Sequence, residues 1–283
     1  MSDASAPERP ETVIRPPSLS WPDLTASFRA LAHHRDLFYT LTVHRVRVRY
    51  KQSLLGLGWA VLQPLATMAV LTIVFAYIAR VPTGGEPYVL VALAGLVPWT
   101  TFSNALSSAT QSLVSHAQLV TRVYFPREIL PLAYVVAALV DGFVAGLVFL
   151  GLLAFHGRSI GPQVGLALAV LLVLAALVTA FALLLSATQV RFRDVGVAMP
   201  IVLQLLLFAS PVAYPLETVP ARLLPVYQLN PLVGIVENFR RAALDTGPAH
   251  LESLAVSVVW TVVLLPLAYA WFEQLEATAA DVV

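Results

Sequence analysis

The chain contains no cysteine and only one lysine, and these two shortages exclude several kinds of site. Without cysteine there can be no disulfide, no thiol nucleophile and no thiolate-bound metal. A phosphate-binding P-loop requires the pattern Gly-x-x-x-x-Gly-Lys-Ser/Thr. The single lysine, Lys51, follows Tyr50 and precedes Gln52, and no glycine loop comes before it. The sequence therefore predicts that this chain has no P-loop site for ATP-Mg.

Charged residues are scarce as well. They make up 12% of the 283 residues, whereas 58% of the residues are hydrophobic and the mean hydropathy is +0.79. A soluble domain typically has about 25% charged and about 45–50% apolar residues. The formal net charge of +1 provides no broad basic surface, which argues against nucleic acid as a partner. These values predict an all-α membrane protein.

Six windows are long and apolar enough to cross a membrane, since a spanning helix needs about 20 apolar residues. They cover approximately residues 57–79, 88–113, 129–155, 164–188, 195–214 and 251–272. Five prolines fall inside them, which membrane helices tolerate when neighbouring groups satisfy the freed carbonyl groups. We predict a membrane domain of six transmembrane helices over residues 57–283. A disordered cytoplasmic tail (1–22) and amphipathic interface helices (23–56) precede it.

The placement of arginine predicts the orientation, because short cytoplasmic loops are enriched in basic residues. With the N-terminus inside, the short outer loops contain only Arg80 and Arg158. The cytoplasmic flanks then contain Arg45, Arg47, Arg49, Lys51, Arg122, Arg127, Arg191 and Arg193. We therefore expect a multi-pass protein of the inner (plasma) membrane with both termini in the cytoplasm.

The segment before the first span carries four basic residues, Arg45, Arg47, Arg49 and Lys51. Its strict alternation is typical of a strand, but an unpaired strand at a membrane surface would leave its backbone groups unsatisfied. We therefore predict an interfacial helix. It can anchor the chain on anionic lipid headgroups, contact a cytoplasmic partner, or do both.

The inner loop, residues 116–128, mixes apolar and aromatic residues with charged ones. Exposed apolar residues flanked by charge are typical of a docking surface. The alternative is a surface helix that lies on lipid. The candidate docking residues are Val120, Arg122, Tyr124, Phe125, Pro126, Arg127 and Glu128.

The outer segment, residues 216–250, is too interrupted by proline to be a simple span. Within it, an apolar stripe lies opposite Glu237, Arg240 and Arg241 when the residues are placed on a helix. This pattern favours short helices that dip into the outer leaflet and return. An ordinary interfacial helix is the alternative.

Five stretches, taken in order along the chain, carry a resemblance to a known family. They are Arg49–Trp59 continuing to Gln63-Pro64, Val120–Glu128, Val190–Asp194, Asn230–Leu232 with Glu237–Arg240, and Ala280–Val283. In these stretches the chain resembles the ABC-2 type permeases of polysaccharide exporters, the family of the subunits Wzm and TagG.

The resemblance implies a type V exporter-like fold: six transmembrane helices, an amphipathic interface helix, a cytoplasmic coupling helix and re-entrant periplasmic gate helices. It places the coupling helix in the inner loop, and a second inner loop would also face an ATPase. It implies a periplasmic gate in the outer segment. The second inner loop contributes Arg191, Arg193 and Asp194, and the gate contains Pro231, Glu237, Phe239 and Arg240.

The resemblance also implies partners. They are a second copy of the chain, two nucleotide-binding ABC ATPase subunits that bind ATP-Mg, a polyprenyl-linked glycan and membrane lipids. The chain itself would be a transport subunit and not an enzyme. The alternatives are an ABC-2 exporter of a lipid or drug and, more remotely, a membrane-embedded glycosyl or lipid transferase. A transferase would need clustered acids, histidines or metal ligands, and here the acids are scattered.

A glycan path would require aromatic rings for the CH faces of sugars and polar side chains for their hydroxyl groups. Asp141 lies about halfway along the third window, where a carboxylate should face protein or water. It can face a channel or make a structural hydrogen bond to a neighbouring helix. The candidate channel residues are Trp99, Phe102, Asn104, Ser107 and Asp141.

Overall fold

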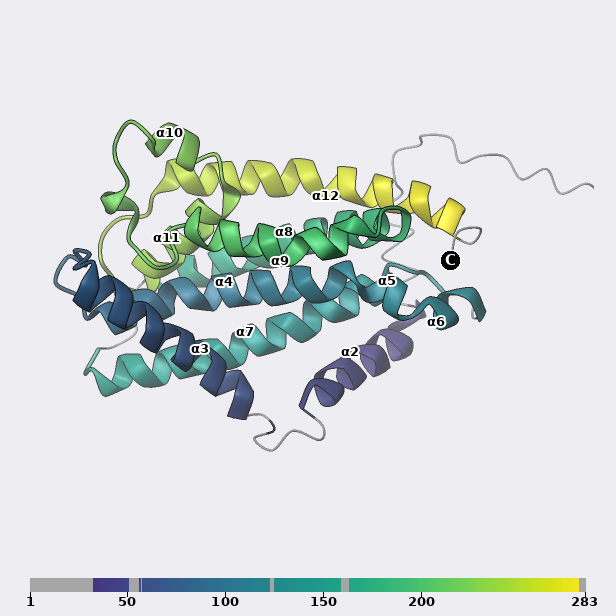
Figure 1. Cartoon of the computed structure of the whole chain (residues 1–283), viewed down its shortest axis with the longest axis horizontal. Coiled ribbons are helices and arrows are strands. Elements are labelled where there is room, and N and C mark those ends of the chain that lie inside the picture. The colour runs from purple at the N-terminus through teal and green to yellow at the C-terminus, as the bar shows by residue number, and fades with distance from the viewer. Residues whose placement is uncertain (1–32, 51–55, 57, 123–124, 159–162, 280–283) are drawn as a thin grey trace, which may run out of the picture.

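The computed structural model describes residues 33–50, 56, 58–122, 125–158 and 163–279. Within these ranges every regular element is a helix and no strand occurs. Figure 1 shows that the long helices run roughly along the length of the molecule, with shorter helices at both ends. The all-α architecture predicted from the composition is confirmed.

Five of the described helices are long and apolar enough to cross a membrane. The most enclosed is α4 (Tyr88–Thr110), because the rest of the chain buries 78% of its most apolar window. It packs against α7, α8 and α11, while α12 packs against α8 and α11. The other four are α3 (Gly58–Leu71) with its extension η1 (Thr72–Ile78), α7 (Ile129–Phe155), α8 (Val164–Arg191) and α12 (Leu251–Ala279).

The extension η1 is a π-helix in which no residue is buried. Backbone bonds in a π-helix reach five residues back. The N–H of Ala79 accordingly donates to the carbonyl of Val74 at 2.8 Å. The first predicted span is therefore present, but its C-terminal part, η1, is wound differently from its beginning.

The fifth predicted span, residues 195–214, forms a shorter helix, α9 (Asp194–Phe208). Its 15 residues measure about 22 Å, whereas the hydrocarbon layer is about 30 Å thick. Residues 209–215 are turns and irregular backbone before the short 3-10 helix η2 (Leu216–Thr218). Pro211 lies in this stretch, and it lacks the N–H that a continuing helix would use. The described chain thus has five full-length spans and one shorter apolar helix.

The outer segment contains α10 (Leu224–Tyr227) and α11 (Pro231–Leu244). Asn230 caps α11 by accepting a hydrogen bond from the N–H of Leu232 at 3.0 Å. α11 packs against α4, α8 and α12 and is buried over most of its length. It is therefore an internal helix of the bundle and not a helix that lies on its surface.

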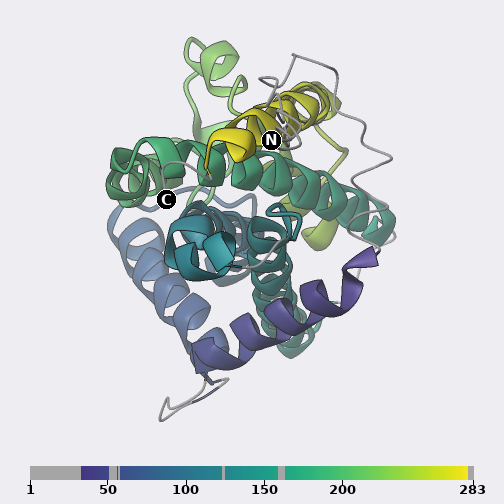
Figure 2. The same ribbon diagram turned by 90° about the vertical axis from the view of Figure 1, so that its right-hand side faces the viewer.

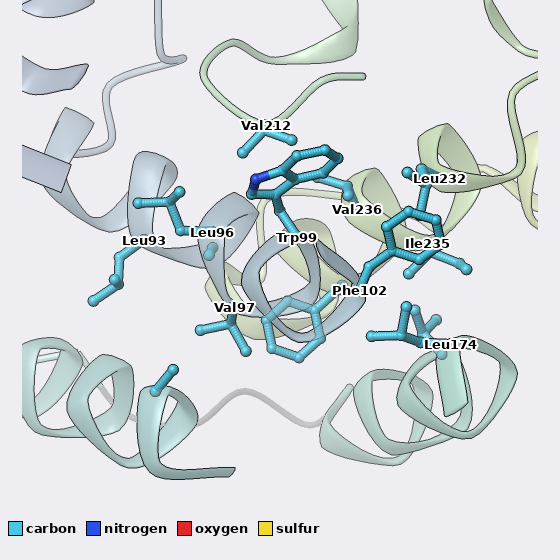
Figure 3. Packing of buried hydrophobic residues seen from close by; sticks show 14 of the residues in the cluster. Leu93, Leu96, Val97, Trp99, Phe102, Leu174, Val212, Leu232, Ile235 and Val236 are labelled. Carbon is cyan, nitrogen blue, oxygen red and sulfur yellow. The ribbon is translucent and has the colours of Figure 1, made fainter. Parts of the chain in front are cut away.

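Two apolar cores hold the helices together. The main core joins α4, α7, α8 and α11, and Figure 3 shows Trp99 and Phe102 of α4 among Leu174 and Ile235. The second core lies at the opposite end from α11 and includes Phe125. It joins α7, α8 and α12 to α5 (Ser112–Ser115) and to the described parts of the inner loop, which contains α6 (Ala117–Arg122).

Candidate functional site

The predicted interface segment is a helix, α2 (Arg35–Tyr50), so the helical alternative is confirmed over the strand. α2 packs against α7, and Figure 2 shows it (purple) lying across the outside of the bundle. Leu37, Phe38 and Leu41 are partly buried against the second core. The amphipathic helix therefore has an apolar face that contacts protein.

Two of the basic residues of α2 turn toward the bundle. The guanidinium carbon of Arg45 lies 4.3 Å from the centre of the Tyr134 ring, which is a cation–π contact. Arg49 forms an ion pair and hydrogen bond with Asp141 of α7. Arg47 is exposed, and Lys51 lies outside the described residues. Arg45 and Arg49 therefore attach α2 to α7 instead of forming one solvated basic row.

The ion pair with Arg49 shows how a carboxylate is accommodated at position 141. Its carboxylate lies about halfway along α7 and is mostly buried, with 11% of the side chain exposed. A buried carboxylate is strongly disfavoured unless it has a charged or hydrogen-bonding partner. Of the two alternatives for Asp141, a channel-facing carboxylate or a structural contact with a neighbouring helix, the structure shows the structural contact. Its partner is Arg49 of α2.

The inner loop is more buried than predicted. Val120 and Phe125 are 8% and 5% exposed, because both side chains pack into the second core with residues of α8 and α12. The expectation that these two residues form an exposed apolar surface is therefore wrong. Arg122 is exposed and Pro126 and Arg127 are partly buried, while Tyr124 lies outside the described residues.

Glu128 lies directly before α7 and is 7% exposed. Burial raises the pKa of its carboxyl group above the ordinary range, and the negative charge of Glu273 on α12 raises it further. The hydrogen bond that Glu128 accepts from its own backbone and the charge of His34 act in the opposite direction. Glu128 thus lies where the inner loop, α12 and the chain just before α2 meet.

The second inner loop joins α8 to α9 and is exposed at Arg191, Arg193 and Asp194. The guanidinium of Arg191 lies 5.6 Å from the ring of Phe192, which is also exposed. Since α5 packs against α8, this loop and the inner loop belong to the same end of the bundle. That end therefore presents a charged surface with an aromatic ring in it.

The charged residues Glu237, Arg240 and Arg241 of α11, which the sequence places opposite the apolar stripe, are largely buried. Side-chain exposure is 4% for Arg240 and 2% for Glu237, and the two form an ion pair of 2.7 Å. Arg240 also donates to the carbonyls of Pro211 and Val212, the latter at 3.1 Å, and to that of Val91 at 3.3 Å. We call Glu237 and Arg240 the buried anchor.

The buried anchor explains how residues 209–216, the broken segment, can lie inside an apolar bundle. Irregular backbone at membrane depth must be buried in protein that satisfies its polar groups. Besides Arg240, the hydroxyl of Tyr88 donates to the carbonyl of Ala213 at 2.6 Å. The amide of Asn230 donates to the carbonyl of Ala209 at 3.0 Å. These side chains take the place of the missing helical bonds.

Sequence reasoning missed Tyr88, Asn230 as a backbone ligand, and Gly95. A methyl group on Gly95 would collide with the carbonyl of Val212, so glycine allows the broken segment to lie against α4. The one available signal was proline at position 211, which marks a helix break but does not name its partners.

The other gate candidates also hold elements together. Pro231 occupies the first turn of α11, where its missing N–H costs nothing. The ring of Phe239 lies 6.3 Å from that of Phe149 on α7. Arg241 bridges Glu237, at 2.9 Å, and Glu217 beside the broken segment. The outer segment is thus tied to the bundle by buried and half-buried charges.

The channel candidates fall into two groups. Trp99 and Phe102 are 7% and 2% exposed and lie inside the main core, so neither lines a channel within this chain. The reason is that α4, which carries them, is enclosed by other helices. Ser107 is exposed, whereas Asn104 and Asp141 share a pocket of about 190 Å³. This polar pocket is lined by Arg49, Trp59, Ala60, Gln63, Pro64, Thr100, Asn104, Asp141 and Ala145.

A larger pocket, of about 360 Å³, lies between α7, α8 and α11 and is lined almost entirely by apolar side chains. Among the described residues, no three acids or histidines are grouped so that they could hold a metal ion. The described residues thus form an end that carries both inner loops and the attached helix α2, a buried anchor near α11, and a polar pocket halfway along α4 and α7.

Comparison with known proteins agrees with this arrangement. The profile of the ABC-2 type transporter family matches residues 36–244. The chain is 30% identical over 250 residues to the O-antigen export system permease protein RfbA of Myxococcus xanthus, which covers 87% of this chain and 95% of that protein. It is 22% identical over 250 residues, with the same coverage, to the Klebsiella pneumoniae protein of that name.

A third relative is the polysialic acid transport protein KpsM of Escherichia coli. It is 25% identical over 244 residues, which are 83% of this chain and 92% of that protein. The family match begins in α2 and ends with α11, so it takes in the inner loop, the polar pocket and the buried anchor. Because it extends over most of the chain, the chain belongs to the ABC-2 type transporter family.

Proposed function

We propose that the chain is the membrane permease subunit of an ATP-driven exporter that moves lipid-linked polysaccharide from the cytoplasm across the inner membrane. The observation that carries this proposal is the match along most of the chain to permeases named for O-antigen export and polysialic acid transport. The apolar helices provide the membrane domain that such a permease needs.

Two nucleotide-binding ABC ATPase subunits supply the energy, since the sequence contains no P-loop. They dock on the end that carries the inner loop and the second inner loop. Arg122, Arg191 and Arg193 provide charged contacts there, because all three are exposed. Val120 and Phe125 contribute differently from the sequence-based prediction: their burial fixes the loop to α8 and α12, so that a push on the loop moves the bundle.

A second copy of the chain completes the path. Two of the apolar helices are poorly covered within one chain: only 11% of the most apolar window of α3 and η1 is buried, and α9 buries only Met199 and Leu203. These helices supply the faces between copies and toward the substrate. In this arrangement α9 and the broken segment together make the sixth crossing, both termini are cytoplasmic, and the buried anchor supports the periplasmic gate.

The proposal is tested by reconstitution. The chain is expressed with and without a candidate ABC ATPase subunit, and copurification and ATP-dependent movement of polyprenyl-linked glycan into sealed vesicles are measured. Glycan transport is expected only when both proteins and ATP are present. Transport by the chain alone, or transport of lipid or drug but no glycan by the complex, would contradict the proposal.

A further inference from the structure

The polar pocket brings together side chains from four helices at one depth of the bundle. Arg49 comes from the end of α2 and Trp59 from the beginning of α3. Asn104 and Asp141 come from the interior of α4 and α7. At about 190 Å³ it is separate from the larger apolar pocket beside α8, and no part of the buried anchor lines it.

Two amides of this pocket are available to a ligand. The side chains of Gln63 and Asn104 make no hydrogen bond within the parts of the chain that the structure describes. Each amide offers two N–H donors and one acceptor oxygen. Such groups are costly in an apolar bundle unless they face water or a polar ligand. The pocket thus has unused donors and acceptors on α3 and on α4, both of which line it.

The charge of the pocket selects against an anion. A free arginine would favour phosphate or carboxylate. Arg49 is instead paired with Asp141, and the other described lining residues are uncharged. A carboxylate in such a pair retains lone pairs that accept hydrogen bonds from hydroxyl groups. The pocket therefore suits a neutral ligand with several hydroxyl groups.

Trp59 gives the polar pocket an aromatic surface. Its side chain lines the pocket and is 50% exposed, so part of its ring is accessible from outside the chain. An indole ring offers a broad apolar face. Pyranose rings have an apolar CH face and a rim of hydroxyl groups, which correspond to this face and to the amides and carboxylate beside it.

We propose that the polar pocket is a binding site for a sugar ring, in which Trp59 packs against the ring and Gln63, Asn104 and Asp141 hydrogen-bond its hydroxyl groups. The assignment rests on the proposed function, because the sugar would be a unit of the exported glycan. It adds a location and a chemistry: a neutral hexose unit, held between α3, α4 and α7.

The absence of cysteine allows a direct test. Ala60→Cys places a single thiol in the pocket, and Thr67→Cys places one on the same helix outside the lining set. Both positions are partly buried, which makes them a matched pair. Each variant, in the full chain assembled with its ATPase, is reacted with a small charged thiosulfonate. Methyl glucopyranoside, methyl mannopyranoside, methyl galactopyranoside and inorganic phosphate are added as competitors.

At least one of the three glycosides is expected to slow the reaction of Ala60→Cys and to leave that of Thr67→Cys unchanged. Adding Asn104→Leu to Ala60→Cys should raise the glycoside concentration for half-protection by about three- to tenfold, as expected for the loss of one hydrogen bond. Adding Gln63→Leu to Ala60→Cys should also raise the glycoside concentration for half-protection. This second variant keeps the test valid if Asn104→Leu does not fold.

Three outcomes would overturn the assignment: an Ala60→Cys thiol that does not react with the charged reagent, no protection by any of the glycosides, or protection by phosphate alone. Glycan transport by the wild-type complex is measured separately. If transport is ATP-dependent and no protection occurs, the pocket assignment fails and the proposed function stands. If the complex transports no glycan, the proposed function fails, and the pocket assignment that rests on it fails too.

Discussion

At the scale of single residues, the buried anchor makes Arg240 more important for stability than its neighbours on α11. Removing one partner of a buried ion pair costs about 3–5 kcal/mol, and without Arg240 the buried Glu237 would keep only Arg241 as an ionic partner. Arg240→Gln would also remove donors to the carbonyls of Pro211 and Val212. We expect this variant to lose at least that much free energy of unfolding, measured by denaturant titration in detergent micelles.

The matched control is Arg222→Gln, since Arg222 is exposed in the same outer segment. It should change the free energy of unfolding by less than about 0.5 kcal/mol. Equal effects of the two variants would show that the anchor does not support the broken segment. Replacing both Glu237 and Arg240 with leucine and methionine should cost less than Arg240→Gln, because no buried carboxylate then remains short of a partner and Arg241 keeps its ion pair with Glu217.

Glu128 gives a residue-scale prediction about pH. Its pKa in the folded chain lies above the ordinary value of 4.5, so the folded state holds the proton more tightly than the unfolded chain does. Its contribution to stability is complete below pH 4.5 and is lost as the pH rises through the raised pKa. Glu128→Gln should therefore flatten the pH dependence of the unfolding midpoint above pH 4.5, as thermal unfolding would show. An unchanged pH profile would contradict this expectation.

At the scale of elements, α2 depends on Arg49 for its attachment to the middle of α7. Arg49→Gln removes the charge of the ion pair with Asp141 and should speed amide hydrogen exchange along α2. Arg47→Gln is the control on the same helix, because Arg47 is exposed. Exchange that is equally fast in both variants would mean that apolar packing alone holds α2.

The elements also show what the sequence could predict. Hydrophobic windows located α3, α4, α7, α8 and α12, since length and apolarity decide whether a helix suits a membrane. They failed at α9, where the window of residues 195–214 is apolar throughout but its helix ends at Phe208. Hydropathy measures transfer into lipid and not backbone geometry. It therefore could not distinguish a helix from an irregular segment whose carbonyls are satisfied by Tyr88 and Arg240.

The sequence identified residue types in the candidate site more reliably than it identified their surroundings. The amphipathic pattern of α11 correctly indicated a helix with Glu237 and Arg240 opposite its apolar stripe, but it did not indicate that both side chains are buried. A pattern on one helix cannot reveal that carbonyls of the broken segment lie opposite. Likewise, the aromatic residues Trp99 and Phe102 were suitable for a channel, and only the enclosure of α4 shows that they belong to the core.

At the scale of the whole molecule, the two inner loops should act together as the surface for the ATPase. Replacing Arg122, Arg191 and Arg193 with alanine removes exposed charges from both loops without touching the second core. We expect at least a tenfold loss of ATP-dependent glycan transport, equivalent to about 1.4 kcal/mol. The chain should still unfold at the wild-type temperature.

The control is Arg222→Ala, which removes an exposed charge from the opposite end of the molecule. It should leave the rate of ATP-dependent glycan transport unchanged. If the triple variant transports glycan as fast as this control, the ATPase docks elsewhere.

The π-helical winding of η1 has a consequence for the side chains that follow α3. Returning the segment to α-helical bonding would shift its register by one residue, which turns every following side chain by about 100° around the axis. No residue of η1 is fully buried, and the turn would exchange only the contacts of Phe75 and Ala76, which are partly buried against the main core. The outer part of this crossing can thus present a different row of side chains to its surroundings by rewinding in place, without sliding or tilting in the membrane.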